Sequence, residues 1–191
     1  EADPVLREQL VWQTAEMLRD SVGDWAAARK EFEQIADRPS ELGQKARVAL
    51  IELAQEEGRT DLIAPALIRA LEFASTPDER LQLSVSLARA RRELSEQALA
   101  AEAYEAVLEL APDDIESLSY VADYAEHLGD REEAFRYWLR IARLDASVAW
   151  PKIKTLINEV DSRELYSLVD PPWPLPRDVA EALCERFVNE K

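Results

Sequence analysis

The feature that most constrains the fold is a glycine–aspartate pair that occurs twice, each time at the same place in a recurring pattern of apolar residues. The pairs are Gly23-Asp24 and Gly129-Asp130. The pattern around them recurs about every 34 residues, and a fixed period of this length indicates a fold built from stacked helical units. Because stacked units present an extended surface, the repeat favours a binding function over a catalytic pocket.

The segment 115–146 shows most clearly how one unit is built. Leu118 and Ala122 are four residues apart and therefore lie on one face of a helix. Gly129 can adopt the left-handed conformation that ends this helix. The Asp130 carboxylate can then accept backbone N–H groups at the start of a second helix. The unit is therefore predicted to be a pair of antiparallel helices.

The upstream units keep this pattern and carry aromatic residues at fixed places. Ser95 occupies the glycine slot of the preceding unit, and Tyr104 lies in its second helix. The first unit has Trp12 in its first helix and Ala28-x3-Phe32 in its second. These features resemble the tetratricopeptide repeat (TPR) family, whose pattern combines an early Trp, a turn glycine and a later Ala-x3-Phe.

The resemblance covers about residues 9–146 and implies an all-α, right-handed superhelix of stacked antiparallel helix pairs with a C-terminal capping helix. Thr76 followed by Pro77 is a helix start signal. We expect about eleven helices and no sheet. The four pairs are expected at about residues 9–42, 44–77, 81–114 and 115–146.

The segment 147–191 departs from the repeat. It is predicted to hold a degenerate fifth unit with a short helix over 153–160 and a capping box at Asp161 and Glu164. The run 171–176 contains four prolines and predicts a stiff connector. Val179, Leu183 and Phe187 then form the apolar stripe of a final helix that covers the end of the stack.

Charge and composition exclude several classes of function. The net charge is −16, from 39 acidic and 23 basic residues, which disfavours nucleic acid and anionic membrane surfaces as partners. The sequence contains no stretch of about 18 apolar residues, so direct membrane insertion is not expected. The sequence starts at Glu1 without a starting Met or the apolar stretch of a signal peptide. We expect either a processed mature protein or, by preference, a segment of a longer protein. The arginine-rich composition suggests a bacterial source, in either the periplasm or the cytoplasm.

No motif predicts a catalytic, cofactor or metal site. His127 is the one histidine, and Cys184 the one cysteine, so no second His or Cys completes a zinc set. No nucleophile motif or glycine-rich phosphate loop is present. Large aromatic residues at the helix–helix positions are expected in the core rather than on a ligand platform. They are Trp12, Trp25, Phe32, Tyr104 and Trp138.

The resemblance implies a groove lined by the first helix of each unit. The lysine and asparagine clamp of chaperone-binding members is absent, since its slots hold pairs such as Gln13/Met17 and Val48/Glu52. Lys45 takes an earlier groove slot of the second unit. The predicted partner-binding positions are Gln13, Met17, Asp20, Val48, Glu52, Glu56, Val85, Arg89, Arg92, Ser119, Asp123 and Glu126.

These observations predict a non-enzymatic scaffold for protein–protein interactions. Its partner is expected to be another protein or peptide, basic or mixed in charge, with an apolar anchor. Family analogy suggests a segment of a larger bacterial assembly, such as an envelope, exopolysaccharide-export or secretion machine. The alternative is an accessory or regulatory domain of an enzyme that binds a small ligand or metal near His127.

Overall fold

The computed structural model describes residues 3–161, 165 and 177–189, and these contain helices and no strand. The all-α stack of helix pairs predicted from the repeat is confirmed. The chain divides into two compact units, residues 1–100 and 101–191. The division falls inside α6 (Gln97–Leu110).

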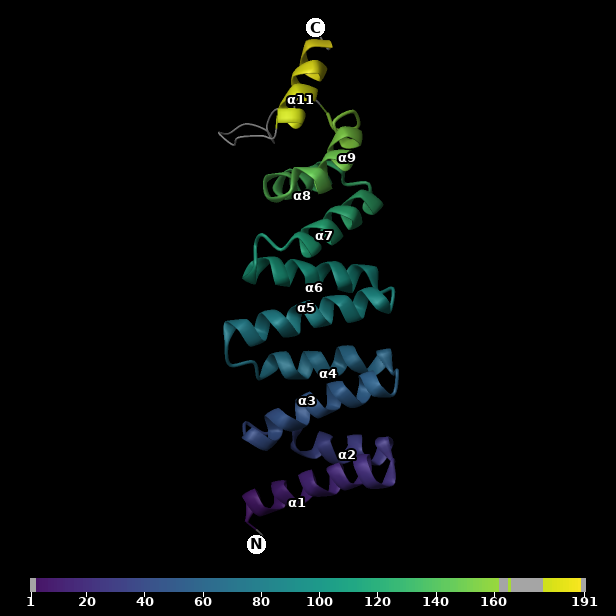
Figure 1. Cartoon of the computed structure of the whole chain (residues 1–191), viewed down its shortest axis with the longest axis vertical. Helices are drawn as coiled ribbons and strands as arrows, with labels where there is room; N and C mark the ends of the chain where they lie inside the picture. The colour runs from purple at the N-terminus through teal and green to yellow at the C-terminus, as the bar shows by residue number, and fades with distance from the viewer. Residues whose placement is uncertain (1–2, 162–164, 166–176, 190–191) are drawn as a thin grey trace. The chain divides into compact units, whose positions relative to one another are not determined.

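In the first unit, consecutive helices pack side by side in antiparallel order (Figure 1). Helix α1 continues into one turn of π-helix, Leu18–Val22, and α1 also contacts α3. The helices are α1 (Pro4–Met17), α2 (Trp25–Ala36), α3 (Glu41–Glu56), α4 (Thr60–Glu72) and α5 (Pro77–Glu93).

Small side chains bring the first three helices close together. Ala15, Ala28 and Ala46 are fully buried where α1, α2 and α3 meet. Phe32 fills the space beside them, and its ring centroid lies 5.1 Å from that of Trp12. This arrangement explains the alternation of alanines with large aromatic residues, since close helix packing needs both small contacts and filled gaps.

The helix ends follow the predicted cap chemistry. Gly23 has φ of 72°, and the Asp24 carboxylate accepts the Ala27 N–H at 3.0 Å. Thr76 accepts the Glu79 N–H at 3.2 Å. Ser95, in the glycine slot, has φ of 60°, a conformation that is strained for a residue with a side chain. The turn geometry therefore persists where the glycine does not.

Helix α3 begins at Glu41, before the residue at which the sequence predicted the second unit to start. Ser40 is its N-cap and accepts the Gly43 N–H at 3.1 Å. Gly43 lies inside the helix because the backbone of the α2–α3 turn passes against it. A Cβ at this position would lie 2.1 Å from the Arg38 carbonyl oxygen.

Arg47 is a buried cation that sequence patterns did not reveal. Its guanidinium donates to the carbonyl oxygens of Ala36 at 2.6 Å and Arg38 at 3.2 Å. It also stacks over the Phe73 ring, 4.2 Å from the centroid. Burial lowers the pKa of this guanidinium from its ordinary value. Arg47 thus supplies donors to carbonyls that the end of α2 leaves without helical partners.

The second unit contains α7 (Ile115–Leu128), α8 (Arg131–Leu144), α9 (Ala146–Leu156) and α11 (Arg177–Asn189). Helices α7 and α8 pack as an antiparallel pair (Figure 1). Leu118, Ala122 and Trp138 are buried between them, as the repeat predicted. Gly129 has φ of 82°, and Asp130 accepts the Glu133 N–H at 3.1 Å.

The Tyr104 hydroxyl connects the second half of α6 to α7. It donates to Glu116 Oε1 at 3.0 Å, and the Tyr104 ring is fully buried with its centroid 4.5 Å from that of Tyr120. The aromatic slot of this unit is therefore a core position, as predicted.

Helix α9 differs from the helix predicted over 153–160, because it starts at Ala146 and runs through Pro151. Asp145 caps it by accepting the Ser147 N–H at 2.9 Å. The helix passes Pro151, although proline lacks the N–H that an internal helical residue donates. The final helix α11 packs against α9 through buried Val179 and Leu183.

Arg186 joins the two elements further, since it donates to the carbonyl oxygens of Ile157 and of Val160. The predicted capping box at Glu164, the connector at 171–176 and the Phe187 side chain lie outside the described residues. The predicted division of the chain at residue 146 stays a prediction.

Candidate partner-binding groove

A groove separates α1 from α3 in the first unit, with a volume of about 450 Å³. Each of these helices is the first helix of a helix pair in the repeat. The resemblance to TPR proteins implies that such first helices bind the partner. The lining residues are Trp12, Arg19, Gln44, Lys45, Val48, Ala49 and Glu52.

The floor of the groove is apolar. Trp12 is half-buried, because one side packs against Phe32 while another side lines the groove. Val48 is 50% exposed, and Ala49 beside it is buried. An exposed valine next to a half-covered indole leaves apolar surface that a partner's side chain can bury.

The rim carries both signs of charge. Arg19 donates to the Asp20 carboxylate at 2.6 and 3.3 Å. This hydrogen bond, helped by nearby carboxylates that include Glu52, raises the pKa of the Arg19 guanidinium. Lys45 donates to Glu41 Oε1 at 2.6 Å, one turn away on its own helix. The groove is therefore mixed in charge rather than acidic.

The remaining predicted positions of the first unit are placed as follows. Gln13 and Asp20 are exposed, and Met17 is 55% exposed on α1. Glu56 is exposed in the last turn of α3. On α5, Val85 is half-buried, whereas Arg89 and Arg92 are exposed.

Three positions that the sequence predicted for the groove, Lys45, Val48 and Glu52, line it, and their role in partner binding stays a prediction. The other lining residues, Trp12, Arg19, Gln44 and Ala49, were not predicted there. Trp12 was assigned wholly to the core because aromatic residues at helix–helix contacts are usually buried. Trp12 is partly exposed because it lies on α1, the first helix of a repeat pair, and lines the groove there. The position of Trp12 in the repeat already places it on that groove-lining helix.

In the second unit, two predicted groove carboxylates bind a lysine of the next helix. Lys152 Nζ on α9 lies 2.7 Å from Asp123 Oδ1 and 3.2 Å from Glu126, both on α7. The Trp138 indole N–H donates to Glu126 at 2.7 Å, and the Lys152 ammonium lies 5.4 Å from the Trp138 ring centroid. Ser119, also on α7, is half-buried.

These contacts perturb the lysine. Burial alone would lower the pKa of the Lys152 ammonium, but the hydrogen bonds to Asp123 and Glu126 outweigh it and raise that pKa. The two carboxylates therefore already have an internal cation, and their role in partner binding stays a prediction.

His127 is exposed in the last turn of α7. Across residues 3–161, 165 and 177–189, no group of three or more His, Cys, Asp or Glu residues could hold a metal ion. No helix in these same residues combines the length and apolar character needed to cross a bilayer.

The comparisons with known proteins agree with the fold. No protein-family model matches the chain, and no curated protein matches it. Among solved structures, the crystal structure of MamA is similar over 92% of this chain and 94% of that chain, with 12% sequence identity and a TM-score of 0.50. At this identity the similarity shows the fold alone: a TPR-like stack of helix pairs.

Proposed function

We propose that this chain is a non-enzymatic scaffold of the TPR family that binds another protein or peptide in the groove between α1 and α3. One observation carries the proposal. The resemblance to TPR proteins implies a partner-binding role for Val48 and Glu52, and the same residues line an open groove with an apolar floor.

The groove chemistry defines the partner. An aliphatic or aromatic side chain fits against Trp12 and Val48, where it would bury apolar surface worth about 25 cal/mol per Å². Lys45, Arg19 and Glu52 at the rim match a partner of mixed charge. Opposite charges at the rim set orientation and association rate more than affinity.

The negative net charge of −16 adds a long-range preference. Acidic partners are repelled at a distance, and basic or mixed partners are steered inward, with a range of about 8–10 Å at ordinary salt. The arginine-rich composition supports a bacterial source, and we extend the proposal to a segment of a larger assembly, with envelope or export machinery as one setting.

The proposal is tested in two stages. A pull-down with the whole chain from the parent organism identifies the partner, and calorimetry then measures its affinity. Val48→Asp places a charge on the apolar floor and is expected to weaken binding about tenfold or more. Ile68→Asp is the matched control, because Ile68 is 39% exposed on α4 and does not line the groove.

Equal affinities of Val48→Asp and the unaltered chain would contradict the proposal. Equal weakening by both variants would also contradict it, since the effect would then arise from charge alone. Circular dichroism and thermal unfolding of both variants show that each remains folded.

A further inference from the structure

A second cavity of the first unit lies between α1 and α2, away from the groove lined by Trp12 and Val48. Its volume is about 230 Å³. This is below the roughly 300–1,000 Å³ of sites for drug-sized ligands, so it suits one short group. The lining residues are Pro4, Arg7, Glu8, Val11, Gln34, Ile35 and Arg38.

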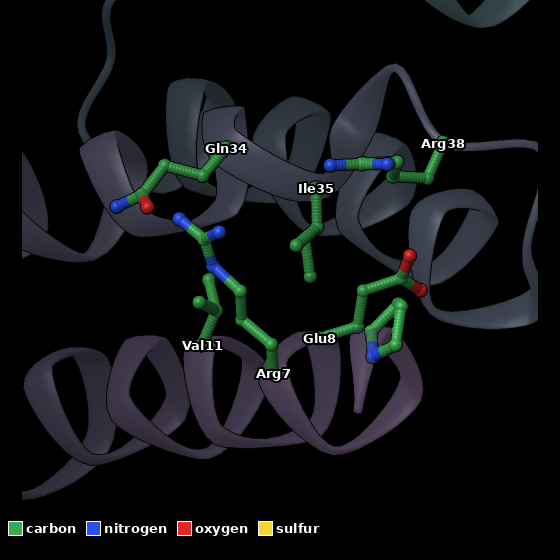
Figure 2. Close-up of a pocket in the computed structure, with 7 residues that line it drawn as sticks. Arg7, Glu8, Val11, Gln34, Ile35 and Arg38 are labelled. Atoms are coloured by element: carbon green, nitrogen blue, oxygen red, sulfur yellow. The ribbon is translucent and has the colours of Figure 1, made fainter. Parts of the chain in front are cut away.

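Two arginines extend into this cavity without an ion-pair partner among the described residues. Seven arginines lie in residues 3–72, and five of them form a hydrogen bond or an ion pair with a carboxylate or a backbone carbonyl. Arg7 and Arg38 are the other two, and both line the same cavity. Figure 2 shows them reaching toward the space around Ile35 from different elements, Arg7 from α1 and Arg38 from the turn after α2.

The backbone that carries Arg38 is held firmly. The Arg38 N–H donates to the Ile35 carbonyl at 3.0 Å, and its own carbonyl accepts from Arg47 at 3.2 Å. Gly43 packs so closely against that carbonyl that a Cβ has no room. The Ser40 hydroxyl donates to Glu8 at 2.8 Å and ties the same turn to α1. One wall of the cavity is therefore pre-organised, which lowers the entropy cost of binding.

The cavity combines these cations with an apolar floor. Ile35 is buried, Val11 lies across from it (Figure 2), and Pro4 also lines the cavity. Guanidinium groups bind oxyanions through paired hydrogen bonds, and an apolar floor accepts the carbon chain attached to such an anion. Glu8 reduces the local charge of the two arginines from +2 to +1, which matches one negative charge better than the two of a phosphate.

We propose that this cavity binds the carboxylate of a short aliphatic acid, with Arg7 and Arg38 holding the carboxylate and Val11 and Ile35 contacting the carbon chain. Two sources carry this group: a free small acid, and the terminal or side-chain carboxylate of a peptide. The site goes beyond the proposed scaffold function, because it shares no lining residue with the α1–α3 groove.

The test is a titration of the whole ¹⁵N-labelled chain, followed through the Nε–H signals of Arg7 and Arg38 and the amide signals of Val11 and Ile35. Hexanoate represents the free acid, and N-acetyl-leucine represents a peptide end. We expect saturable shifts at these four residues with at least one of the two, and the tighter binder identifies the source. The neutral analogues hexanamide and N-acetyl-leucinamide are expected to produce none.

Arg7→Gln and Arg38→Gln are each expected to weaken binding about tenfold, since each removes one charge-assisted hydrogen-bonding group. Lys30→Gln is the matched control, because it removes the same charge from an exposed position of α2 outside the cavity, and it should leave binding unchanged.

Three outcomes would overturn the assignment. The first is the absence of saturable shifts with both acids, and the second is equal weakening by Lys30→Gln. The third is inorganic phosphate binding as tightly as the carboxylates, which would show that the arginines do not select a single charge.

Discussion

The α1–α3 surface and the α7–α9 surface take the same pair of positions in the predicted repeat, yet an open groove lies on the first and ion pairs bridge the second. In the first, Lys45 pairs with Glu41 on its own helix, and the groove beside Val48 remains open. In the second, Lys152 crosses from α9 to Asp123 and Glu126 on α7.

The difference teaches that a repeated fold does not present repeated binding surfaces. Each surface has a lysine on its second helix, and the partner of that lysine decides what remains available. The intrahelical pair leaves the lysine on its own helix, whereas the interhelical pair places the lysine across the space between two helices. Binding capacity therefore depends on individual side chains that the repeat pattern leaves unspecified.

The largest expected difference between the surfaces concerns their tryptophans. Trp138→Ala should destabilise the fold by about 3–5 kcal/mol, because the side chain is buried and its indole N–H donates to Glu126. Trp12→Ala should have a smaller effect, about 1–3 kcal/mol, since Trp12 is half-buried on the groove. Urea unfolding of both variants measures the difference. Equal losses would show that the two aromatic sites are equally enclosed.

Replacing the lysines should give a smaller difference in stability between the two surfaces. Lys152→Met should lose about 0.5–1 kcal/mol, a figure already reduced for the partial exposure of its ion pairs. Lys45→Met should lose about 0.3–0.5 kcal/mol, the value of an exposed pair one helical turn apart. Chemical unfolding at low salt checks both values. A larger loss at Lys45 than at Lys152 would reverse the comparison.

The Lys152 contribution should also depend on pH. Its pKa is raised in the folded chain, so protonation is more favourable there than in the unfolded chain. The stabilisation is therefore complete below the unfolded lysine pKa of about 10.4 and disappears as the pH rises through the higher folded value. The gap between the unaltered chain and Lys152→Met should be constant from pH 7 to about 9 and shrink above 10.

Effects of opposite sign are expected at the turns that both units share. Ser95→Gly should stabilise the chain by about 0.5–1 kcal/mol, because Ser95 has φ of 60°, where glycine is unstrained. Gly129→Ser should destabilise it by a similar amount, since Gly129 has φ of 82°. Thermal unfolding checks both signs. A loss of stability in Ser95→Gly would show that the serine side chain stabilises its turn.

Local patterns in the sequence predicted most of the helical pairing. The Gly129 turn, the Asp130 cap and the buried Trp138 all depend on residues close together in the chain, and such signals can be read from spacing. The start of α9 was not predicted: the helix begins at Ala146, directly after the Asp145 cap, and continues through Pro151.

Features that depend on distant residues were not predictable in the same way. Arg47 is buried because the carbonyls of Ala36 and Arg38 lie beside it, and no local pattern encodes that contact. Lys152 reaches Asp123 across 29 positions of sequence. The α1–α3 groove and the α1–α2 cavity likewise arise from how neighbouring helices pack, so the repeat located the groove helices and part of the lining, such as Val48 and Glu52, but not the rest.

Photo-crosslinking tests the contrast between the two surfaces most directly. Val48 and Ser119 occupy the same slot of their repeats, so a benzophenone amino acid at each position compares the α1–α3 groove with the surface that Lys152 bridges. With the purified partner and the whole chain, the account predicts abundant crosslinks from position 48 and none from position 119. Equal crosslinking from both positions, or crosslinking from position 119 alone, would contradict the assignment of partner binding to the α1–α3 groove.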